Sequence, residues 1–333
     1  MAGGPSTPAL AAAVCNAGGF GFVAAGYLTA EALRTQIDTV RDLTDRPFGV
    51  NLFAPPSTPA PRSALEAYAE TIAPMAAAAG VSLGTPRFDD DHFDAKLAVL
   101  LETRPAVVSF TFGSSDPGTI RELQARGIEV WITITSREEA RTAALSGADA
   151  LVVQGAEAGG HQGSFVDTDD VPMPLLDLLR ATRAVVAELP LRHADCRLIA
   201  TGGLQTGAQI VAALDAGANA AQLGTAFMLC PEAATSDAHR VALASAAQTT
   251  LTRAFTGRRA RGIVNAWTDA VGDAAPKAYP EVHHMTAPMR AHGRRIGNPD
   301  LFNLWAGVNH ELTRAVPAAQ IVAELAAEIA AAR

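Results

Sequence analysis

Short apolar segments rich in β-branched and aromatic residues alternate along the chain with longer segments of helical periodicity. The apolar segments carry few polar residues, which is typical of parallel strands buried on both faces. We predict seven such strands, at residues 19–25, 48–53, 107–113, 129–135, 150–155, 198–203 and 220–227. Helices are predicted around and between them, at residues 9–16, 29–42, 63–79, 119–125, 136–146, 175–189 and 206–216. Many of these helices end at a glycine, and the repeated strand–helix alternation predicts an α/β fold.

The fold class predicted from this repeat is a TIM (β/α)8-type barrel whose first strand is missing. A closed barrel of this type needs eight strands, and the pattern provides seven. The chain opens on MAGGPST, which fits a loop that leaves a strand, and the helix 9–16 follows at once. We therefore expect the functional protein to begin upstream of Met1.

Two long segments depart from the strand–helix repeat. One separates the second and third predicted strands and opens on PPSTPAP; the other follows the last strand, with a helical stretch at 236–251 and a basic turn at 258–261. The C-terminal segment has an amphipathic helix at 317–331. We predict a barrel at 1–227 with 55–104 as an insertion, a mostly helical second domain over the barrel mouth at 228–316, and a C-terminal helix packing back on the barrel at 317–333.

Composition narrows the functional classes. The 333 residues are 49% hydrophobic and 18% charged, as in a globular protein with a large core. The net charge of −8 with no basic patch argues against nucleic acid as a partner. There is no apolar run long enough for a membrane span and no signal peptide pattern, so we expect a cytoplasmic protein. Cys15, Cys196 and Cys230 lack disulfide or zinc spacing, and with only Lys96 and Lys277 a mechanism that needs several lysines is excluded.

The strand at 150–155 leads into the most distinctive motif, VVQGAEAGGHQGSF. Active sites of parallel barrels lie at the carboxyl ends of the strands, and Gln154 is the last polar side chain of this one. His161 follows within a cluster that includes Gly159, and glycine on both sides lets backbone shape itself around a bound group. His161 is either a general acid or base, which imidazole suits near neutral pH, or a histidine of a surface loop.

The last two strands end in paired glycine loops. IATGG carries Gly202 and Gly203 and leads into a helix whose first amides are expected to point at the turn. AAQLGTAF carries Gly224 and Thr225. Glycine loops in these two consecutive units are the usual phosphate site of such barrels. The phosphate belongs to a flavin, a nucleotide or a phosphorylated substrate.

Other polar positions carry less information. Asn51, in an otherwise apolar strand, must be hydrogen-bonded to a neighbouring loop, to the polar edge of a ring or to a ribityl hydroxyl. His283 and His284 have no third ligand at metal spacing, and the acidic run 89–94 fits a solvated turn, so no metal site is predicted. There is no nucleophile–histidine–acid set to support covalent hydrolase chemistry.

Taken in order, these motifs resemble the nitronate monooxygenase family. The resemblance extends over essentially the whole chain, and AEAGGHQG is its most specific piece, whereas the glycine loops are shared with many FMN barrels. The tail at 286–307 is similar to class I members. The segments that carry the resemblance are MAGGPSTPALAAAVCNAGG at the start, NLFAP at 51–55, VVQGAEAGGHQG at 152–163, IATGGL at 199–204 and AAQLGTAFM at 220–228.

The resemblance implies an FMN-bound barrel that oxidises alkyl nitronates, including propionate 3-nitronate, with O2 to a carbonyl compound and nitrite. The family histidine falls on His161, as the base towards neutral nitroalkanes and a group that orients the anionic substrate. Family members carry a strand and an Ala-Pro before the position of Met1, which this chain lacks. The cofactor-binding positions expected from the motifs and the resemblance together are Asn51, Gln154, Gly159, Gly202, Gly203, Gln222, Leu223, Gly224 and Thr225.

Three alternatives remain at this point. An NAD(P)H-dependent quinone or enoyl-acyl-carrier-protein reductase of the same superfamily shares the AGGH and GG features. A flavin-free phosphate-binding barrel acting as an isomerase or aldolase predicts a colourless protein. A non-catalytic remnant is the third. The oligomeric state and the preferred nitronate are not fixed by the sequence.

Overall fold

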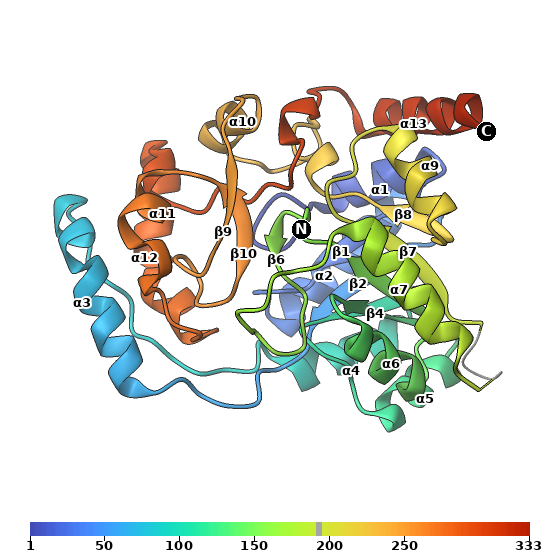
Figure 1. Ribbon diagram of the computed structural model, residues 1–333, viewed down its shortest axis with the longest axis horizontal. Coiled ribbons are helices and arrows are strands. Elements are labelled where there is room, and N and C mark those ends of the chain that lie inside the picture. The colour runs from blue at the N-terminus through green and yellow to red at the C-terminus, as the bar shows by residue number, and fades with distance from the viewer. Residues whose placement is uncertain (191–194) are drawn as a thin grey trace.

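A curled parallel sheet forms the centre of the computed structural model, which describes residues 1–190 and 195–333 (Figure 1). Its seven strands are hydrogen-bonded in the order β1-β2-β3-β4-β5-β7-β8, and all seven predicted strands are confirmed. Among the described residues β1 and β8 each pair with one neighbour only, so the sheet is an open half-barrel. The strands are β1 (Phe22–Ala24), β2 (Gly49–Phe53), β3 (Val107–Thr111), β4 (Glu129–Ile134), β5 (Ala150–Gln154), β7 (Arg197–Thr201) and β8 (Ala220–Gln222).

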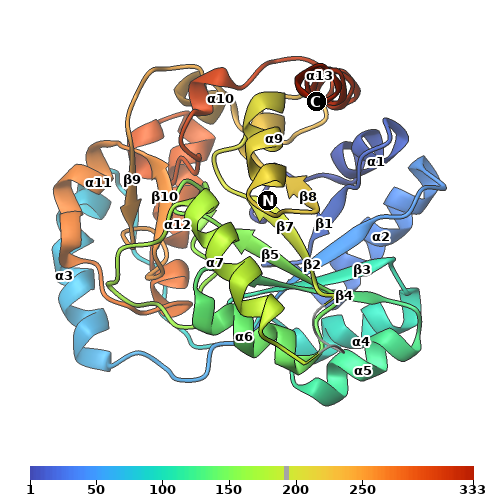
Figure 2. The same ribbon diagram turned by 45° about the vertical axis from the view of Figure 1, so that its right-hand side comes forward.

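Helices surround the convex side of the sheet, as Figure 2 shows. Leu10, Ile210 and Ile321 share an apolar cluster, so the last helix, α13, packs on α1 and α9. These outer helices are α1 (Pro8–Asn16), α2 (Ala30–Leu43), α4 (Phe93–Thr103), α5 (Pro117–Ala125), α6 (Arg137–Ser146), α7 (Leu175–Ala187), α9 (Gly207–Asp215) and α13 (Ala318–Ala332).

Helix ends follow the capping chemistry of the sequence, with one difference. Thr29 and Ser136 cap α2 and α6, because their hydroxyls accept hydrogen bonds from Ala32 N and Glu139 N. Ser136 and Glu139 have the S-x-x-E spacing of a capping box, in which the Glu carboxylate would accept from the Ser136 N–H. The Glu139 carboxylate instead accepts from Thr135 N at 2.7 Å and from Phe165 N at 2.6 Å, so it fixes the loop that follows His161.

The segment after β8 contains a small antiparallel sheet that the sequence analysis did not predict. The expected helix over 236–251 is wrong beyond residue 243: α10 (Asp237–Leu243) ends there, and β9 (Thr249–Thr252) pairs with β10 (Ala260–Ile263). The threonine-rich run TTLT favours a strand once a partner strand is available. The end of the predicted basic turn at 258–261 forms the start of that partner strand, β10. The third strand is β6 (Gly160–His161), beside β10.

Helices and short turns complete this second region. Helix α3 lies against it rather than against the sheet, because Tyr68 Oη donates to Ala254 O at 2.5 Å and Ile72 packs in the same cluster as Trp267. The two helices of the predicted insertion at 55–104 therefore belong to different parts of the molecule: α3 packs on the second region, and α4 packs on α2 of the half-barrel. The remaining elements are α3 (Arg62–Ala78), α11 (Ala266–Val271), α12 (Glu281–Ile296) and the 3-10 turns Thr225–Phe227, Gly272–Ala274, Pro299–Leu301 and His310–Leu312.

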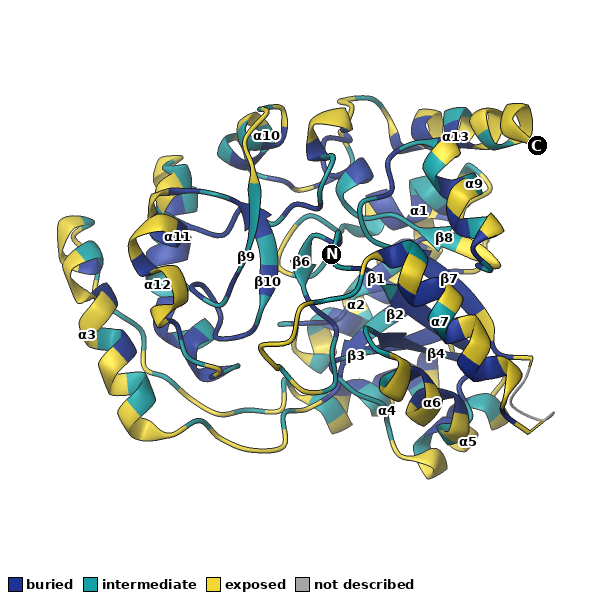
Figure 3. Ribbon diagram, viewed as in Figure 1, coloured by how far each residue is buried: buried dark blue, intermediate teal, exposed yellow. Residues whose placement is uncertain are grey.

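Buried residues concentrate in the parallel sheet and on the inner faces of its helices, whereas the outer helix faces are exposed (Figure 3). Val50, Phe110 and Ile132 are fully buried on neighbouring strands. None of the helices in 1–190 or 195–333 is both long and apolar enough to cross a membrane. The apolar runs in the sequence therefore serve the sheet, whose carboxyl ends face the second region.

Candidate active site

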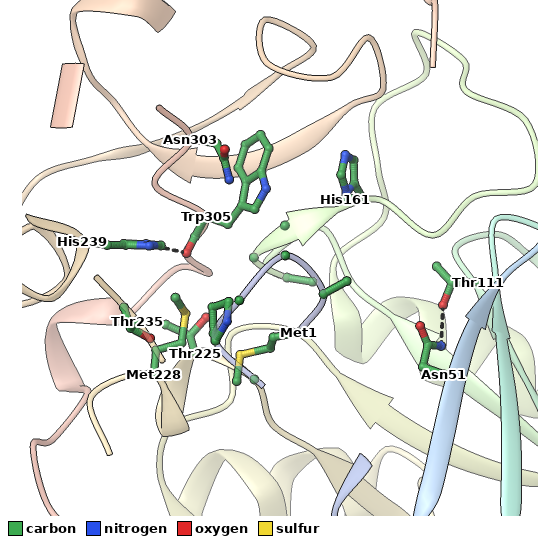
Figure 4. Close-up of a pocket in the computed structure, with 18 of the residues that line it drawn as sticks. Met1, Asn51, Thr111, His161, Thr225, Met228, Thr235, His239, Asn303 and Trp305 are labelled. Carbon is green, nitrogen blue, oxygen red and sulfur yellow. Dashed lines mark hydrogen bonds between the residues drawn. The ribbon is translucent and has the colours of Figure 1, made fainter. Parts of the chain in front are cut away.

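A cavity of about 510 Å³ lies at the carboxyl ends of the strands, between the half-barrel and the second region (Figure 4). Its volume is within the range of small-molecule and cofactor sites. The structure brings all ten predicted site residues to its wall, and their individual roles remain predictions. They are Asn51, Gln154, Gly159, His161, Gly202, Gly203, Gln222, Leu223, Gly224 and Thr225.

His161 is held in place from two sides. Its backbone forms β6, paired with Ala260 of β10, so the second region fixes one side of it. The Gln154 side chain fixes the other: its Nε2 donates to His161 O at 3.1 Å, and its Oε1 accepts from Gly163 N at 2.6 Å. The amide of Gln154 therefore anchors the loop that carries His161. The sequence analysis expected Gln154 to contact a cofactor, and that role stays a prediction.

The His161 imidazole is neutral at physiological pH. Burial, and after it the positive charges of Arg258 and Arg290, lower its pKa to about 3. The rings of Phe112, Tyr279 and Trp305 enclose it, with ring centres 5.6 to 5.7 Å from that of the imidazole. A neutral imidazole in an enclosed cavity has the protonation state that a general base requires.

Thr256 holds the His161 ring through one of its nitrogens. Its Oγ1 lies 2.8 Å from His161 Nε2 and 3.3 Å from Arg258 O. Which of Oγ1 and Nε2 donates depends on the tautomer of the ring: when Nε2 carries the proton and donates to Thr256, Nδ1 has the lone pair that a base needs. Thr256 is 2% exposed, so water does not compete for this contact.

The glycine loops after β7 and β8 offer unpaired backbone amides. In the part of the chain that the structure describes, the N–H groups of Gly202, Gly203, Gly224 and Thr225 have no acceptor. Gly202 and Gly203 adopt positive φ values of 124° and 68°, which glycine tolerates best. Successive amides in such a turn form a concave site for an anionic oxygen group.

The structure corrects one expectation, that the first amides of the helix after the IATGG loop point at the turn. The first amides of α9 do not face the cavity, because Glu328 of α13 accepts from Gly207 N at 2.5 Å and Thr206 caps Gln209 N. Protein groups thus satisfy the helix end that was expected to bind a phosphate. The loop amides, rather than the start of α9, are the available donors.

Asn51 has partners on the neighbouring strand. Its Nδ2 donates to Ser109 Oγ at 2.9 Å and to Thr111 Oγ1 at 3.0 Å, the latter visible in Figure 4. The sequence left open a loop partner, a ring edge and a ribityl hydroxyl. These bonds fix the amide through its nitrogen, and its Oδ1 accepts no protein hydrogen bond among residues 1–190 and 195–333.

Several wall residues were missed by the sequence analysis. Tyr27, from the turn after β1, stacks on His283 of α12 with ring centres 4.2 Å apart, and Arg290 lies on the same helix. His239, Arg294, Asn303 and Trp305 also contribute from the second region. The adjacent pair His283 and His284 was the one signal in the sequence that pointed to this wall, and the sequence analysis considered the pair only as metal ligands. Within the described residues no group of three or more potential metal ligands is present.

His239 predicts a measurable dependence of stability on pH. Burial lowers its pKa to about 4, and its Nε2 donates to Trp305 O at 3.1 Å. Between pH 6.5 and pH 4 the unfolded chain binds this proton and the folded chain does not, so the free energy of unfolding falls as pH decreases. His239→Asn should reduce that fall, between pH 7 and pH 5, by about 1–2 kcal/mol in urea unfolding. The exposed His92→Asn is the control, and equal slopes in both variants would contradict the expectation.

Comparisons with known proteins agree over the whole chain. A family model described as nitronate monooxygenase matches residues 1–328. The nitronate monooxygenase of Pseudomonas aeruginosa is 41% identical over 336 residues, covering 98% of this chain and 93% of that protein. That of Paraburkholderia phytofirmans is 38% identical over 340 residues, covering 98% and 90%. A solved nitroalkane oxidase from Streptomyces ansochromogenes is similar with a TM-score of 0.95 and 47% identity over 100% of this chain and 94% of that one. FabK from Thermotoga maritima has a TM-score of 0.75 and 25% identity over 100% and 91%.

Proposed function

This chain belongs to the nitronate monooxygenase family, and we propose that it oxidises alkyl nitronates of the propionate 3-nitronate class with O2 to a carbonyl compound and nitrite. Enzymes of this family are flavin-dependent oxidoreductases, and we propose FMN as the flavin here. The observation that carries the proposal is a neutral, enclosed His161 in the same cavity as the unpaired amides of the glycine loops. The comparisons favour none of the reductase, isomerase or remnant alternatives.

The residues present fit FMN. The amides of Gly202, Gly203, Gly224 and Thr225 would hold the phosphate, and the Oδ1 of Asn51 would accept from a ring or ribityl donor. Gln222 and Leu223 line the cavity between these groups, and Gly159 lets the loop 306–307 approach closely. When bound, FMN supplies the redox chemistry that takes electrons from the substrate and passes them to O2.

His161 has two tasks in this proposal. Towards a neutral nitroalkane its unprotonated nitrogen removes the proton from the carbon that bears the nitro group, and the contact of Nε2 with Thr256 holds the ring in place. A nitronate has already lost that proton, so towards it His161 only orients the substrate. The surrounding rings of Phe112, Tyr279 and Trp305 exclude water.

The proposed division of the chain assigns a role to each part. The barrel at 1–227 holds the cofactor, residues 228–316 together with α3 cover it, and the C-terminal segment 317–333 packs on α1 and α9. We place the protein in the cytoplasm because Cys15, Cys196 and Cys230 are free and buried, as suits a reducing compartment.

The purified protein tests this function directly. It should release about one FMN per chain on heating and convert ethyl nitronate to nitrite with matching O2 consumption. NADH added without oxygen should leave the flavin spectrum unchanged, because a reductase would bleach it. A well-folded protein that neither contains nor binds FMN, or a flavoprotein that NADH reduces and nitronates do not, would refute the proposal.

A further inference from the structure

Arg290 is a buried cation that faces the cavity. It lies on α12, is 6% exposed and lines the cavity wall. Its Nε donates to Thr286 Oγ1 at 3.0 Å, and one terminal nitrogen donates to His283 O at 2.8 Å. These two bonds fix the guanidinium, and the other terminal nitrogen donates to no protein group among the described residues.

In the described part of the chain, this charge has no acidic group beside it. Within residues 1–190 and 195–333 no carboxylate oxygen lies within 4 Å of the Arg290 guanidinium. Burial and the nearby Arg294 lower its pKa to about 10, so it remains a cation at neutral pH. A buried charge without a counterion is costly, and an anionic ligand would relieve that cost.

The other arginines near the cavity are placed differently. Arg258 donates to Gln162 O and Ser164 O and lies 4.0 Å over the Phe112 ring, so it supports the loop after His161 from outside the cavity wall. Arg294 lines the cavity but donates to Asn303 Oδ1 at 2.8 Å. Of the two arginines in the wall, Arg290 is the one whose charge acts on His161.

From these contacts we infer that Arg290 binds an oxyanion of the substrate beside His161 and gives the site its preference for anionic substrates. The inference deepens the proposed function and rests on it. The oxyanion is either the nitronate group itself or a carboxylate carried further along the substrate. Tyr27 lines the same cavity wall, and its hydroxyl oxygen lies 3.5 Å from that of Tyr279.

Kinetics of Arg290→Gln test the inference and identify the oxyanion. The KM for ethyl nitronate should rise about 10- to 100-fold, the usual effect of losing a charge-assisted hydrogen bond, while the KM for nitroethane changes little. A rise confined to propionate 3-nitronate would assign the carboxylate instead. Equal rises for nitroethane and for the nitronates, or no rise for any, would overturn the inference.

Matched variants separate charge from folding. Arg290→Lys keeps the charge and should recover most of the affinity, whereas Arg295→Gln removes the same charge from an exposed position of α12 and should match the wild type. Thermal melting of each variant shows whether it folds. If Arg290→Gln does not fold, the comparison of propionate with propionamide in the wild type decides.

Calorimetric titration gives a readout that does not depend on turnover. The flavin-loaded wild type should bind propionate at least about 10-fold more tightly than the neutral propionamide, and Arg290→Gln should lose that difference. Equal affinity for the two compounds in the wild type would overturn the inference. If the wild type oxidises no nitronate yet binds propionate through Arg290, the proposed function fails and the anion site stands.

Discussion

Replacing His161 by alanine is expected to slow the oxidation of neutral nitroethane by about 10²- to 10⁴-fold, the usual contribution of a positioned base. Oxidation of pre-formed ethyl nitronate should change much less, because that substrate has no proton left to remove. The low pKa of His161, about 3, means that the imidazole is unprotonated throughout the neutral range. Initial rates of O2 uptake with each substrate, at one pH and saturating FMN, measure the two effects.

The ratio of the two losses distinguishes a base from a packing residue. Equal losses on nitroethane and on ethyl nitronate would show that the ring only packs or binds, because both substrates share everything except the proton. No loss on either would remove His161 from the site. The exposed His92→Ala serves as the control and should retain wild-type rates on both substrates.

The sequence predicted the parallel sheet well because its signal is local. Each strand is an unbroken apolar run such as VVSF or WITI, and burial on both faces leaves that run without polar interruptions. The hairpin of β9 and β10 lacks this signal. TTLT and ARGI are half-polar, lie next to an Ala-rich stretch and become strands by pairing with one another and with β6. Pairing between distant segments is not visible in the periodicity of either one.

The candidate site divides in the same way. The glycine loops and His161 were predictable, because the ends of consecutive parallel strands converge at one edge of the sheet. Tyr27 and Arg290 were not predictable from the sequence. They lie 263 residues apart along the chain, on a turn and a helix that come together only in the folded protein. The capping of α9 by Glu328 was missed for the same reason: the carboxylate belongs to the C-terminal helix.

Replacing Gly224 by aspartate is expected to weaken flavin binding about 100-fold or more while leaving the fold intact. Gly224 has a φ of −116°, which any residue can adopt, and a Cβ added there would meet only Met1, with its nearest atoms at 3.6 Å. The new carboxylate would stand among the amides assigned to the phosphate. Two like charges about 5 Å apart repel by about 3 kcal/mol at an effective dielectric constant of about 20, which raises the Kd for FMN about 100-fold or more.

Gly224→Asn separates charge from size, because asparagine matches aspartate in shape and is neutral. We expect the asparagine variant to bind FMN at least about 10-fold more tightly than the aspartate variant, with both melting near the wild-type temperature. Flavin released on heating and the Kd from fluorescence titration are the measurements. Equal weakening in the two variants would show that bulk alone is responsible, and full flavin content in both would place the phosphate elsewhere in the cavity. Repulsion specific to aspartate would tie an anion to the Gly224 loop, independently of any activity the enzyme has.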